Sequence, residues 1–530
     1  MLRPLILNGF MATGKSTVGA LVAQRAERPF IDLDRAIEVE TGSTVEQLFA
    51  SRGEATFRSL ERAALVRILG EATQAGGQAP VVAVGGGALL PRDLRLKALD
   101  ECVVVTLEGS ATELARRALS QGARPLLAGG NAEQRITELL ALRAPCYAEA
   151  QARIACEAPL ETVVTQVQQA WARDEIGVAA GAASYGVQVG SDYAPERIGS
   201  LVTQSPVTVL ITDKTVAALH AAGIERALSD AGTRVVRIEL EPGEAHKNIS
   251  SIEVIWRAAL AGSVDRQATF VALGGGVVTD MTGFAASTWM RGVRWIAIPT
   301  TLLAMVDASV GGKTGVDLES AKNAVGAFWQ PSAVMCDVHY LSTEATRGFV
   351  SALAEVVKTA LIGDPEMFLL LEANAERVRA RDAQLTAELV RRSVRVKARI
   401  VSFDEREGGL RAVLNLGHTV GHALEAQAGY TALTHGEAVS LGLVAALRLG
   451  EMLGHTPRDL TQRTLELLKR LGLPSNLNGQ PLKAAAALIG HDKKRAGSAV
   501  RFVMARGLGQ VETLPIPLSE LRSHVLALAE

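Results

Sequence analysis

The chain has 530 residues, enough for about three domains of roughly 150 residues each, and 48% of its residues are hydrophobic. Its formal net charge is −1 and its pI is about 6.8, so the overall charge gives no reason to expect nucleic acid or an anionic membrane as a partner. The four cysteines form no CxxC pair, which argues against a disulfide scaffold or a thiolate zinc site. No stretch reaches the roughly 18 apolar residues of a membrane span, so we expect a soluble, cytoplasmic protein.

Residues 1–172 alternate short apolar runs with helical patterns. Leu5–Leu7, Val81–Val84 and Cys102–Leu107 are predicted to be buried parallel strands, each followed by a turn and a helix. This order predicts an α/β domain with a parallel sheet. The small residues that fill most of 173–184 predict a linker after it.

A second α/β region is predicted over residues 185–342, and it is followed by a helical one. From residue 343 to 530 strand patterns nearly vanish, and long periodic helices such as Ala387–Ser402 and Gly436–Leu453 predict an all-helical domain. The strands of the second α/β region are expected at Val207–Ile211, Arg234–Leu240, Thr269–Leu273 and Trp295–Ile298.

The first motif, Gly9-Phe-Met-Ala-Thr-Gly14-Lys15-Ser16, has the spacing GxxxxGK[ST] between a predicted strand and a predicted helix. The backbone N–H groups of such a P-loop, with the N-terminus of the helix, bind nucleotide phosphates. We expect Lys15 to reach the β- and γ-phosphates of ATP and Ser16 to ligate Mg²⁺. The motif alone does not distinguish a kinase from a GTPase or a motor. The expected ATP contacts are Gly9, Ala12, Thr13, Gly14, Lys15, Ser16 and Thr17.

Further short motifs follow the P-loop: Asp32-Leu-Asp34, Phe57-Arg58, Gly85-Gly86-Gly87, Arg124-Pro and Arg143-Ala-Pro. Each is weak alone, but together and in this order they resemble shikimate kinase over most of residues 1–172. The resemblance implies that ATP phosphorylates shikimate, with Asp34 as proton acceptor, Asp32 near Mg²⁺ and Arg124 over the transferring phosphoryl group and the ATP. It implies that shikimate contacts Asp34, Arg58, Gly86, Gly87 and Arg143. The family often has glycine at the position of Ala12.

Three of the nine histidines, His418, His422 and His435, lie within one short stretch. His418 and His422 are four residues apart, which places both imidazoles on one face of a helix. Together with Glu355, His418 and His435 form a Glu/His₂ set with open positions, as catalytic zinc requires, and Co²⁺ suits the same ligands. The sequence therefore predicts a Zn²⁺ or Co²⁺ site here.

A glycine turn, Gly274-Gly275-Gly276, ends a predicted strand and opens a helix, which suits a dinucleotide pyrophosphate although it lacks the GxGxxG spacing. Asp213 stands at a strand end, where a carboxylate suits a ribose hydroxyl. Cations near a later glycine turn, including Lys313, suit a substrate carboxylate or phosphate.

Residues from about 185 to 530 resemble 3-dehydroquinate synthase in several motifs: Pro242-Gly-Glu244-Ala-His-Lys247, Trp289-Met-Arg291-Gly, Gly311-Gly-Lys313-Thr, Glu355-Val-Val-Lys358 and the histidine stretch. The resemblance implies bound NAD⁺, a Zn²⁺ or Co²⁺ ion, and cyclisation of 3-deoxy-arabino-heptulosonate 7-phosphate to 3-dehydroquinate. Phosphate leaves, and NAD⁺ is regenerated in each turnover. Asp317 and Ala321 stand where the family usually has asparagine and glycine.

The same resemblance implies two sets of ligand contacts in this half. For NAD⁺ they are Asp213, Glu244, Lys247, Gly274, Gly275, Gly276, Asp280, Thr300, Thr301, Lys313 and Lys322. For the heptulosonate phosphate they are Arg291, Asp307, Lys313, Asn323, Lys358, Lys397, Arg411, Asn415, His422 and Lys493. Four of these, Arg291, Asn323, Lys358 and His422, are implied to bind the phosphate group and to relay its proton. Lys313 is also assigned to catalysis.

Other functions fit parts of the pattern. A metal- and NAD-dependent polyol or alcohol dehydrogenase has a similar layout, and a gluconate-type kinase would also use Arg58 and Arg143. A regulatory protein with one inactive half is a third alternative. The resemblance also suggests a homodimer formed through the synthase half.

Overall fold

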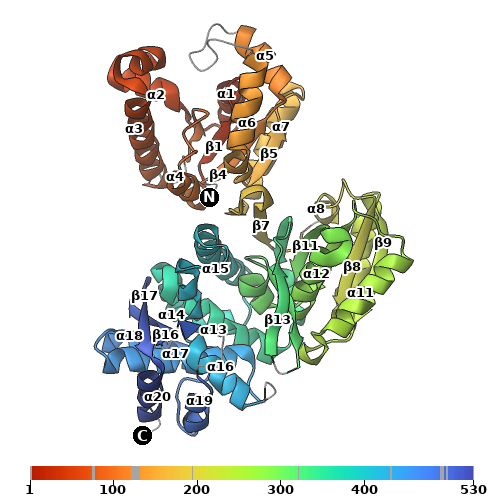
Figure 1. Ribbon diagram of the computed structural model, residues 1–530, viewed down its shortest axis with the longest axis vertical. Helices are drawn as coiled ribbons and strands as arrows, with labels where there is room; N and C mark the ends of the chain where they lie inside the picture. Colours follow the sequence, from red (N-terminus) through yellow and green to blue (C-terminus); the bar gives the residue numbers. More distant parts are fainter. Residues whose placement is uncertain are drawn as a thin grey trace. The chain divides into compact units, whose positions relative to one another are not determined.

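The computed structural model describes residues 3–74, 78–120, 132–193, 195–319, 321–429, 432–489, 495–496 and 499–528 (Figure 1). The chain divides into two compact units, Met1–Gln188 and Val189–Glu530. Within the described ranges, no helix combines the length and the apolar character of a membrane span.

A parallel five-stranded sheet forms the centre of the first unit, in the order β2-β3-β1-β4-β5. Both faces of this sheet are covered, as the continuous apolar runs predict. Leu5 and Leu7 of β1 face a core shared with Val22 of α1, whereas Ile6 faces a second core with Leu65 of α3. The strands are β1 (Leu5–Gly9), β2 (Phe30–Asp32), β3 (Val81–Ala83), β4 (Val103–Glu108) and β5 (Ala152–Ala155).

Seven helices accompany these strands in the described part of the first unit. Helices α2, α3 and α4 lie on one side of the sheet and α1, α5, α6 and α7 on the other (Figure 1). The parallel strands β1, β2 and β3 end at the same sheet edge, which is where the P-loop, Asp32 and the turn after β3 begin. The helices are α1 (Lys15–Arg25), α2 (Leu33–Thr41), α3 (Val45–Gln74), α4 (Arg92–Glu101), α5 (Ala111–Ser120), α6 (Ala132–Ala148) and α7 (Leu160–Arg173).

The segment predicted to be a linker has regular structure. Residues 173–184 contain β6 (Ile176–Val178) and the 3₁₀ turn η2 (Gly181–Ala183), and β6 pairs with β7 (Tyr185–Gly190) in an antiparallel hairpin. Gly181 N–H donates to Glu149 Oε1 (3.2 Å), and Glu149 is a buried partner of Arg95 on α4, at 2.6 Å. This segment therefore packs as part of the first unit.

A parallel sheet also forms the first part of the second unit, with strands in the order β14-β11-β10-β8-β9. The antiparallel hairpin of β12 (Lys313–Leu318) and β13 (Ala321–Phe328) packs against α12 (Gly276–Thr288). The four predicted strands are confirmed as β8 (Val207–Asp213), β9 (Arg234–Leu240), β10 (Thr269–Gly274) and β11 (Arg294–Pro299), and β14 (Ala333–Asp337) completes the set. The helices and turns here are α8 (Pro195–Gly199), α9 (Lys214–Val216), η3 (Ala217–Ala221), α10 (Ala222–Asp230), η4 (Glu244–His246), α11 (Ile249–Ala261), η5 (Trp289–Arg291), η6 (Ala304–Ala308) and η7 (Val338–Thr343).

The last part of the chain is mainly helical, as predicted, but not all-helical. Strand β16 (Ala499–Gly507) pairs with β17 (Gln510–Pro517) and with the two-residue strand β15 (Arg495–Ala496). Strand β17 was not predicted because it contains Pro515 and Pro517, which are atypical of strands. These prolines are tolerated because β17 is an edge strand. The helices are α13 (Thr346–Gly363), α14 (Pro365–Arg379), α15 (Ala383–Phe403), η8 (Leu410–Asn415), α16 (His418–Gln427), α17 (His435–Met452), α18 (Arg458–Leu471), α19 (Leu482–Leu488) and α20 (Leu518–Ala527).

Two glycines let three of these helices come very close together. A Cβ atom on Gly436 of α17 would lie 1.8 Å from the Ser351 carbonyl oxygen of α13, and one on Gly442 would lie 1.9 Å from the Gly417 carbonyl oxygen before α16. No other residue fits at such distances. The N-terminal ends of α16 and α17, which carry His418 and His435, thus meet the middle of α13, which carries Glu355.

Candidate active sites

The P-loop adopts a compact turn between β1 and α1. Lys15 Nζ donates to the carbonyl oxygens of Gly9 (2.9 Å) and Phe10 (2.8 Å), and Ser16 Oγ donates to Asp32 Oδ2 (2.5 Å). The predicted Mg²⁺ ligands Ser16 and Asp32 are therefore neighbours. Ala12 has a left-handed φ of 64°, which a non-glycine residue adopts at a cost of roughly 1–2 kcal/mol, so glycine at this position would be less strained.

The glycine turn after β3 brings the predicted shikimate residues together. A Cβ atom on Gly85 would lie 2.4 Å from Glu61 Oε1 and 3.0 Å from Asp34 Oδ1, and one on Gly87 would lie 2.5 Å from an Arg58 nitrogen. At Gly86, the carbonyl oxygen accepts from Arg143 (3.3 Å) and from the Tyr147 hydroxyl (2.6 Å). The Gly85–Gly87 backbone therefore lies so close to side chains of α2 and α3 that no methyl group would fit at Gly85 or Gly87. Through the Gly86 carbonyl it also contacts side chains of α6.

Two carboxylates, those of half-buried Asp34 and buried Glu61, lie beside this turn. Asp34 Oδ1 and Glu61 Oε1 have no hydrogen-bond partner among the described residues. Burial, followed by the charge of Asp32, raises the pKa of Asp34, while Lys15 and Arg58 oppose the shift. Burial also raises the pKa of Glu61, although Arg58 binds its other oxygen at 2.7 Å. Asp34 thus has an available oxygen and raised basicity, as a proton acceptor needs.

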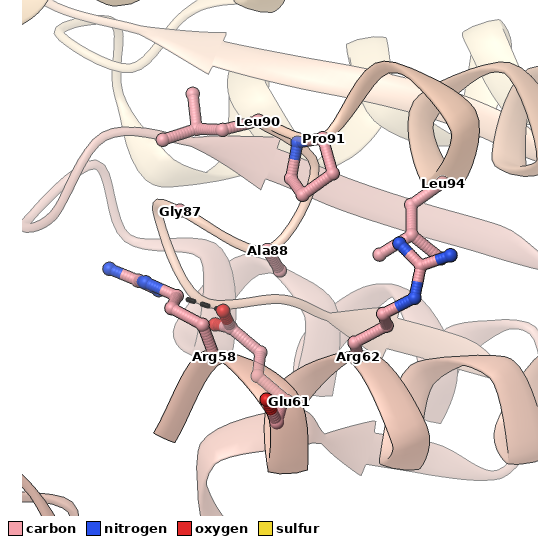
Figure 2. A pocket seen from close by; sticks show the side chains of 9 residues that line it. Arg58, Glu61, Arg62, Gly87, Ala88, Leu90, Pro91 and Leu94 are labelled. Carbon is pink, nitrogen blue, oxygen red and sulfur yellow. Dashed lines mark hydrogen bonds and ion pairs between the residues drawn. The ribbon is translucent and has the colours of Figure 1, made fainter. Parts of the chain in front are cut away.

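A pocket of about 400 Å³ opens beside the same turn (Figure 2). Arg58 and Glu61 of α3 line one wall, where they form an ion pair, and Gly87 and Leu94 lie opposite. Asp34, Arg143 and the P-loop do not line it, so this pocket covers only part of the predicted substrate position. Arg124 lies outside the described residues.

The predicted metal ligands converge in the second unit. Glu355 Oε1 lies 3.5 Å from His418 Nε2 and 3.4 Å from His435 Nε2, and these three ligand atoms lie within 4.8 Å of one another. Glu355 is buried, and its Oε1 atom has no hydrogen-bond partner among the described residues. Burial opposes ionisation, but the adjacent Lys358 ammonium lowers the pKa of Glu355 to about 2. An ionised, unpaired oxygen between two imidazole nitrogens fits a divalent cation.

His422 and Glu425 form a second possible ligand set with His435, again with atoms within 4.8 Å. The rings of His418, His422 and His435 have centroids 5.0–6.1 Å apart. Burial lowers the pKa of His435, but Glu355 and Glu425 outweigh it and raise that pKa to about 10. The predicted grouping of the three histidines is therefore present in the structure.

The second glycine turn, Gly274–Gly276, joins β10 to α12. A Cβ atom on Gly275 would lie 3.2 Å from the Thr301 methyl carbon, and the Gly274 carbonyl oxygen accepts from Thr300 N–H (3.0 Å). The Thr300 hydroxyl is buried and has no hydrogen-bond partner among the described residues. Asp213 Oδ1 instead accepts from the backbone N–H groups of Thr215 and Val216 and caps α9.

Glu344 supports this turn from the helical side of the unit. Its Oε2 atom accepts from Leu302 N–H (3.0 Å), next to Thr301, and burial raises the pKa of Glu344 to about 7.

Between pH 4.5 and 7 the unfolded chain therefore releases the Glu344 proton while the folded chain keeps it, so stability falls as pH rises. In the wild type, the free energy of unfolding should fall by about 3 kcal/mol as pH rises through this range, and Glu344→Gln should abolish this fall. Urea unfolding at pH 5 and pH 8 measures it, and an unchanged difference between these two pH values would contradict the assignment.

Three family descriptions match the chain. Residues 11–172 match "Shikimate kinase", residues 237–351 match "3-dehydroquinate synthase N-terminal" and residues 352–495 match "3-dehydroquinate synthase C-terminal". A 3-dehydroquinate synthase of Bordetella pertussis is 42% identical over 350 residues, covering 66% of this chain and 98% of that protein. That of Citrifermentans bemidjiense is 42% identical over 339 residues, covering 63% and 93%. The chain belongs to the 3-dehydroquinate synthase family and carries a shikimate kinase domain before it.

A solved 2-epi-5-epi-valiolone synthase from Streptomyces hygroscopicus, with NAD⁺ and Zn²⁺ bound, resembles the synthase unit. It is 27% identical with a TM-score of 0.59, and the match covers 64% of this chain and 96% of that one. A 2-deoxy-scyllo-inosose synthase complexed with carbaglucose-6-phosphate, NAD⁺ and Co²⁺ shares the fold at 22% identity and the same TM-score, with 64% and 96% coverage. Shikimate kinase and 3-dehydroquinate synthase are thus joined in one enzyme of the shikimate pathway, and the expected fusion is confirmed.

The predicted cations of the synthase unit are paired with acids. Lys247 Nζ lies 2.6 Å from Asp280 Oδ2 and 2.6 Å from Asn323 Oδ1, so residues predicted for NAD⁺ and for the heptulosonate phosphate meet. Lys397 Nζ lies 2.5 Å from Asp307 Oδ1.

The remaining predicted substrate residues of the synthase unit differ in their surroundings. Arg411 donates to the carbonyl oxygens of Gly311 (3.3 Å) and Glu405 (2.5 Å), Arg291 is exposed at the end of η5, and Lys493 lies outside the described residues. Asp317 Oδ1 accepts from Asn323 N–H (2.7 Å), and Ala321 begins β13.

Several functional neighbours were not predicted. Glu407 pairs with Lys313 and accepts from Asn415 at 3.0 Å, and Glu425 accepts from Lys322 at 2.9 Å. In the kinase unit, Glu61 was missed in the same way. One signal was available: Glu61 follows Arg58 by one helical turn, the spacing of a helix ion pair.

Proposed function

We propose the residues through which this enzyme performs its two reactions. In the kinase unit, Arg58 and Arg143 bind the shikimate carboxylate, and Asp34 accepts the proton of the attacking hydroxyl as ATP transfers its phosphoryl group. Lys15 and the P-loop backbone bind the phosphates, and Ser16 and Asp32 bind Mg²⁺. The observation that carries this assignment is the Oδ1 atom of half-buried Asp34, which lies beside Gly85 and has no hydrogen-bond partner among the described residues. Arg124 over the phosphoryl group stays a prediction.

Asp34→Asn is expected to lower the kinase kcat by about 10²–10⁴-fold, because an amide does not accept the proton. In the wild type, kcat should fall as pH decreases through the raised pKa of Asp34, since only the carboxylate is a base. The amide carries no charge to desolvate, so the melting temperature should not fall. A pH–rate profile and a thermal melt measure both effects. An active variant with an unchanged acid limb would exclude Asp34 as the base.

In the synthase unit, we assign Glu355, His418 and His435 to a divalent metal, Zn²⁺ or Co²⁺. Gly274–Gly276 with Thr300 and Thr301 would bind NAD⁺. When bound, NAD⁺ and the metal supply transient hydride transfer and polarisation of a substrate carbonyl.

The other side chains of the synthase site bind the heptulosonate phosphate and move protons. Lys358, Arg291, Asn323 and His422 would hold the phosphate that is eliminated, and Lys313 and Asp307 would orient the rest of the substrate. The orphaned Glu355 Oε1 between two imidazole Nε2 atoms carries the metal assignment.

Phosphorus NMR tests both activities in one sample. Purified protein is given shikimate, ATP, Mg²⁺, the heptulosonate phosphate, NAD⁺ and Zn²⁺. Shikimate 3-phosphate and free inorganic phosphate should both appear, the second also when ATP is omitted. A missing signal would show that the corresponding unit is inactive or acts on another substrate.

The functional boundaries, the oligomeric state and the location are further proposals. We propose 1–172 for the catalytic part of the kinase, 173–184 for the connecting segment that packs with the kinase unit, 185–342 for the NAD-binding part and 343–530 for the metal-binding part. Leu318, Val325 and Phe328 are exposed on the β12–β13 hairpin, and these apolar side chains support a homodimer through the synthase unit. Light scattering at increasing concentration tests the dimer. We also propose a cytoplasmic location, in keeping with four free cysteines.

A further inference from the structure

His435 has a different carboxylate on each side of its ring. Its Nε2 atom lies 3.4 Å from Glu355 Oε1, on the side of the proposed metal, and its Nδ1 atom lies 3.7 Å from Glu425 Oε2. Glu425 is buried on α16, the helix that also carries His418. A carboxylate against the second nitrogen of a metal-binding imidazole fixes its tautomer and the orientation of its ring.

The other oxygen of Glu425 reaches Lys322, which the resemblance to 3-dehydroquinate synthase predicts to contact NAD⁺. Glu425 Oε1 accepts from Lys322 Nζ at 2.9 Å, and that ammonium also lies 3.8 Å from Glu244. Lys322 is on β13 and Glu244 is in η4, two segments far from α16 in the sequence. Glu244, Lys322, Glu425, His435 and Glu355 therefore form a continuous row of alternating acidic and basic groups.

The two histidines of the metal site are oriented by different means. His418 Nδ1 lies 3.3 Å from the carbonyl oxygen of Leu416, two residues earlier in the chain. Its orientation is set locally by the backbone. The orientation of His435 depends instead on side chains from α16 and β13, so it can respond to what binds beside Lys322.

We propose that Glu425 is a positioning residue for His435, and that Lys322 couples this pair to the NAD⁺ site so that NAD⁺ and the metal strengthen each other's binding. The proposal rests on the metal site proposed above. The competing role, Glu425 as a direct ligand, is less consistent with its contacts. One oxygen of Glu425 accepts from the Lys322 ammonium, and the other lies 3.7 Å from His435 Nδ1. Glu355 Oε1, by contrast, lies within 3.5 Å of the Nε2 atoms of both His418 and His435.

Zinc affinity of the metal-free full chain, measured by competition with a chromophoric chelator, tests the positioning role. We expect Glu425→Gln to weaken Zn²⁺ binding by about 10–100-fold. The visible spectrum of the Co²⁺-loaded variant should keep the coordination number of the wild type. Glu372→Gln, which removes a carboxylate paired with Arg463 on α18, is the matched control and should bind Zn²⁺ normally. Affinity within twofold of wild type, or a changed Co²⁺ coordination number, would overturn the positioning role.

The coupling is measured by repeating the titration with saturating NAD⁺. NAD⁺ should raise the zinc affinity of the wild type by about fivefold or more, and this ratio should fall to about one in Glu425→Gln. Lys322→Met, which leaves the carboxylate in place, should also lose most of the ratio, and it serves if Glu425→Gln does not fold. A ratio that stays at the wild-type value in a folded variant would overturn the coupling.

His418→Ala separates a failure of this inference from a failure of the proposed metal site. It should weaken Zn²⁺ binding by more than about 100-fold, because it removes a direct ligand. If it does not, the metal site itself is wrong. If it does while Glu425→Gln binds normally, only the positioning role is wrong.

Discussion

Lys15→Ala is expected to lower the kinase kcat by about 10³-fold and to leave synthase turnover unchanged. Phosphoryl transfer depends on neutralising the charge that develops on the phosphates, and Lys15 supplies a positive charge inside the P-loop. This ammonium donates to the carbonyl oxygens of Gly9 and Phe10, so it lies inside the P-loop. Coupled spectrophotometric assays of both activities on one preparation measure the effect.

Lys97→Ala is the matched control for this substitution. Lys97 is on α4 in the same unit and pairs with Glu101 on the surface, so its loss should change the kinase kcat by less than about twofold. If Lys15→Ala also removed synthase turnover from a protein with a normal melting curve, the two sites could not be independent.

His435→Ala is expected to have the reverse effect. It removes one of the three proposed metal ligands and leaves the buried, ionised Glu355 with one imidazole fewer beside it. We expect the zinc affinity to fall by more than about 100-fold and synthase turnover to be lost at micromolar Zn²⁺, while kinase turnover stays at the wild-type value. Metal content after gel filtration and the two activity assays measure this.

His455→Ala provides the comparison within the same unit. His455 pairs with Glu512 of β17, and this histidine belongs to neither ligand set found among the described residues. It should bind zinc normally. A normal metal content in His435→Ala would mean that the metal is held by other residues, and the Glu355 site would have to be abandoned.

The sequence predicted those parts of each site that are local in the chain. The P-loop and the histidine stretch each place several functional groups within a few residues, so their spacing indicated their chemistry. The glycine turn after β3 is weak alone and was assigned only through the resemblance to shikimate kinase. Seven of the ten parallel strands in the described residues were also predicted, since buried parallel strands appear as continuous apolar runs. The β16–β17 hairpin was missed because the prolines of β17 removed that signal.

Partners that are distant in the sequence were not found. Lys322 and Glu425 are 103 residues apart, and Lys313 and Glu407 are 94 residues apart, so no periodicity connects them. The sequence identified the cations as ligands for an anionic substrate, but it did not identify the acids with which these cations are paired. Those acids follow only from the tertiary fold, which brings α16 and the loop before η8 next to β12 and β13.

The short segment after α7 determines where this chain can be divided into two separate enzymes. A kinase fragment that ended at Arg173 would lose β6 and η2, and with them the backbone donor that Gly181 provides to Glu149. Arg95 would keep its buried carboxylate partner, but with one contact fewer to hold that carboxylate in place. Arg95 also donates to the carbonyl oxygens of Leu89 and Leu90, the latter in the wall of the pocket of Figure 2. A fragment meant to preserve the kinase should therefore extend to Gln188, well past the end of the family match at residue 172.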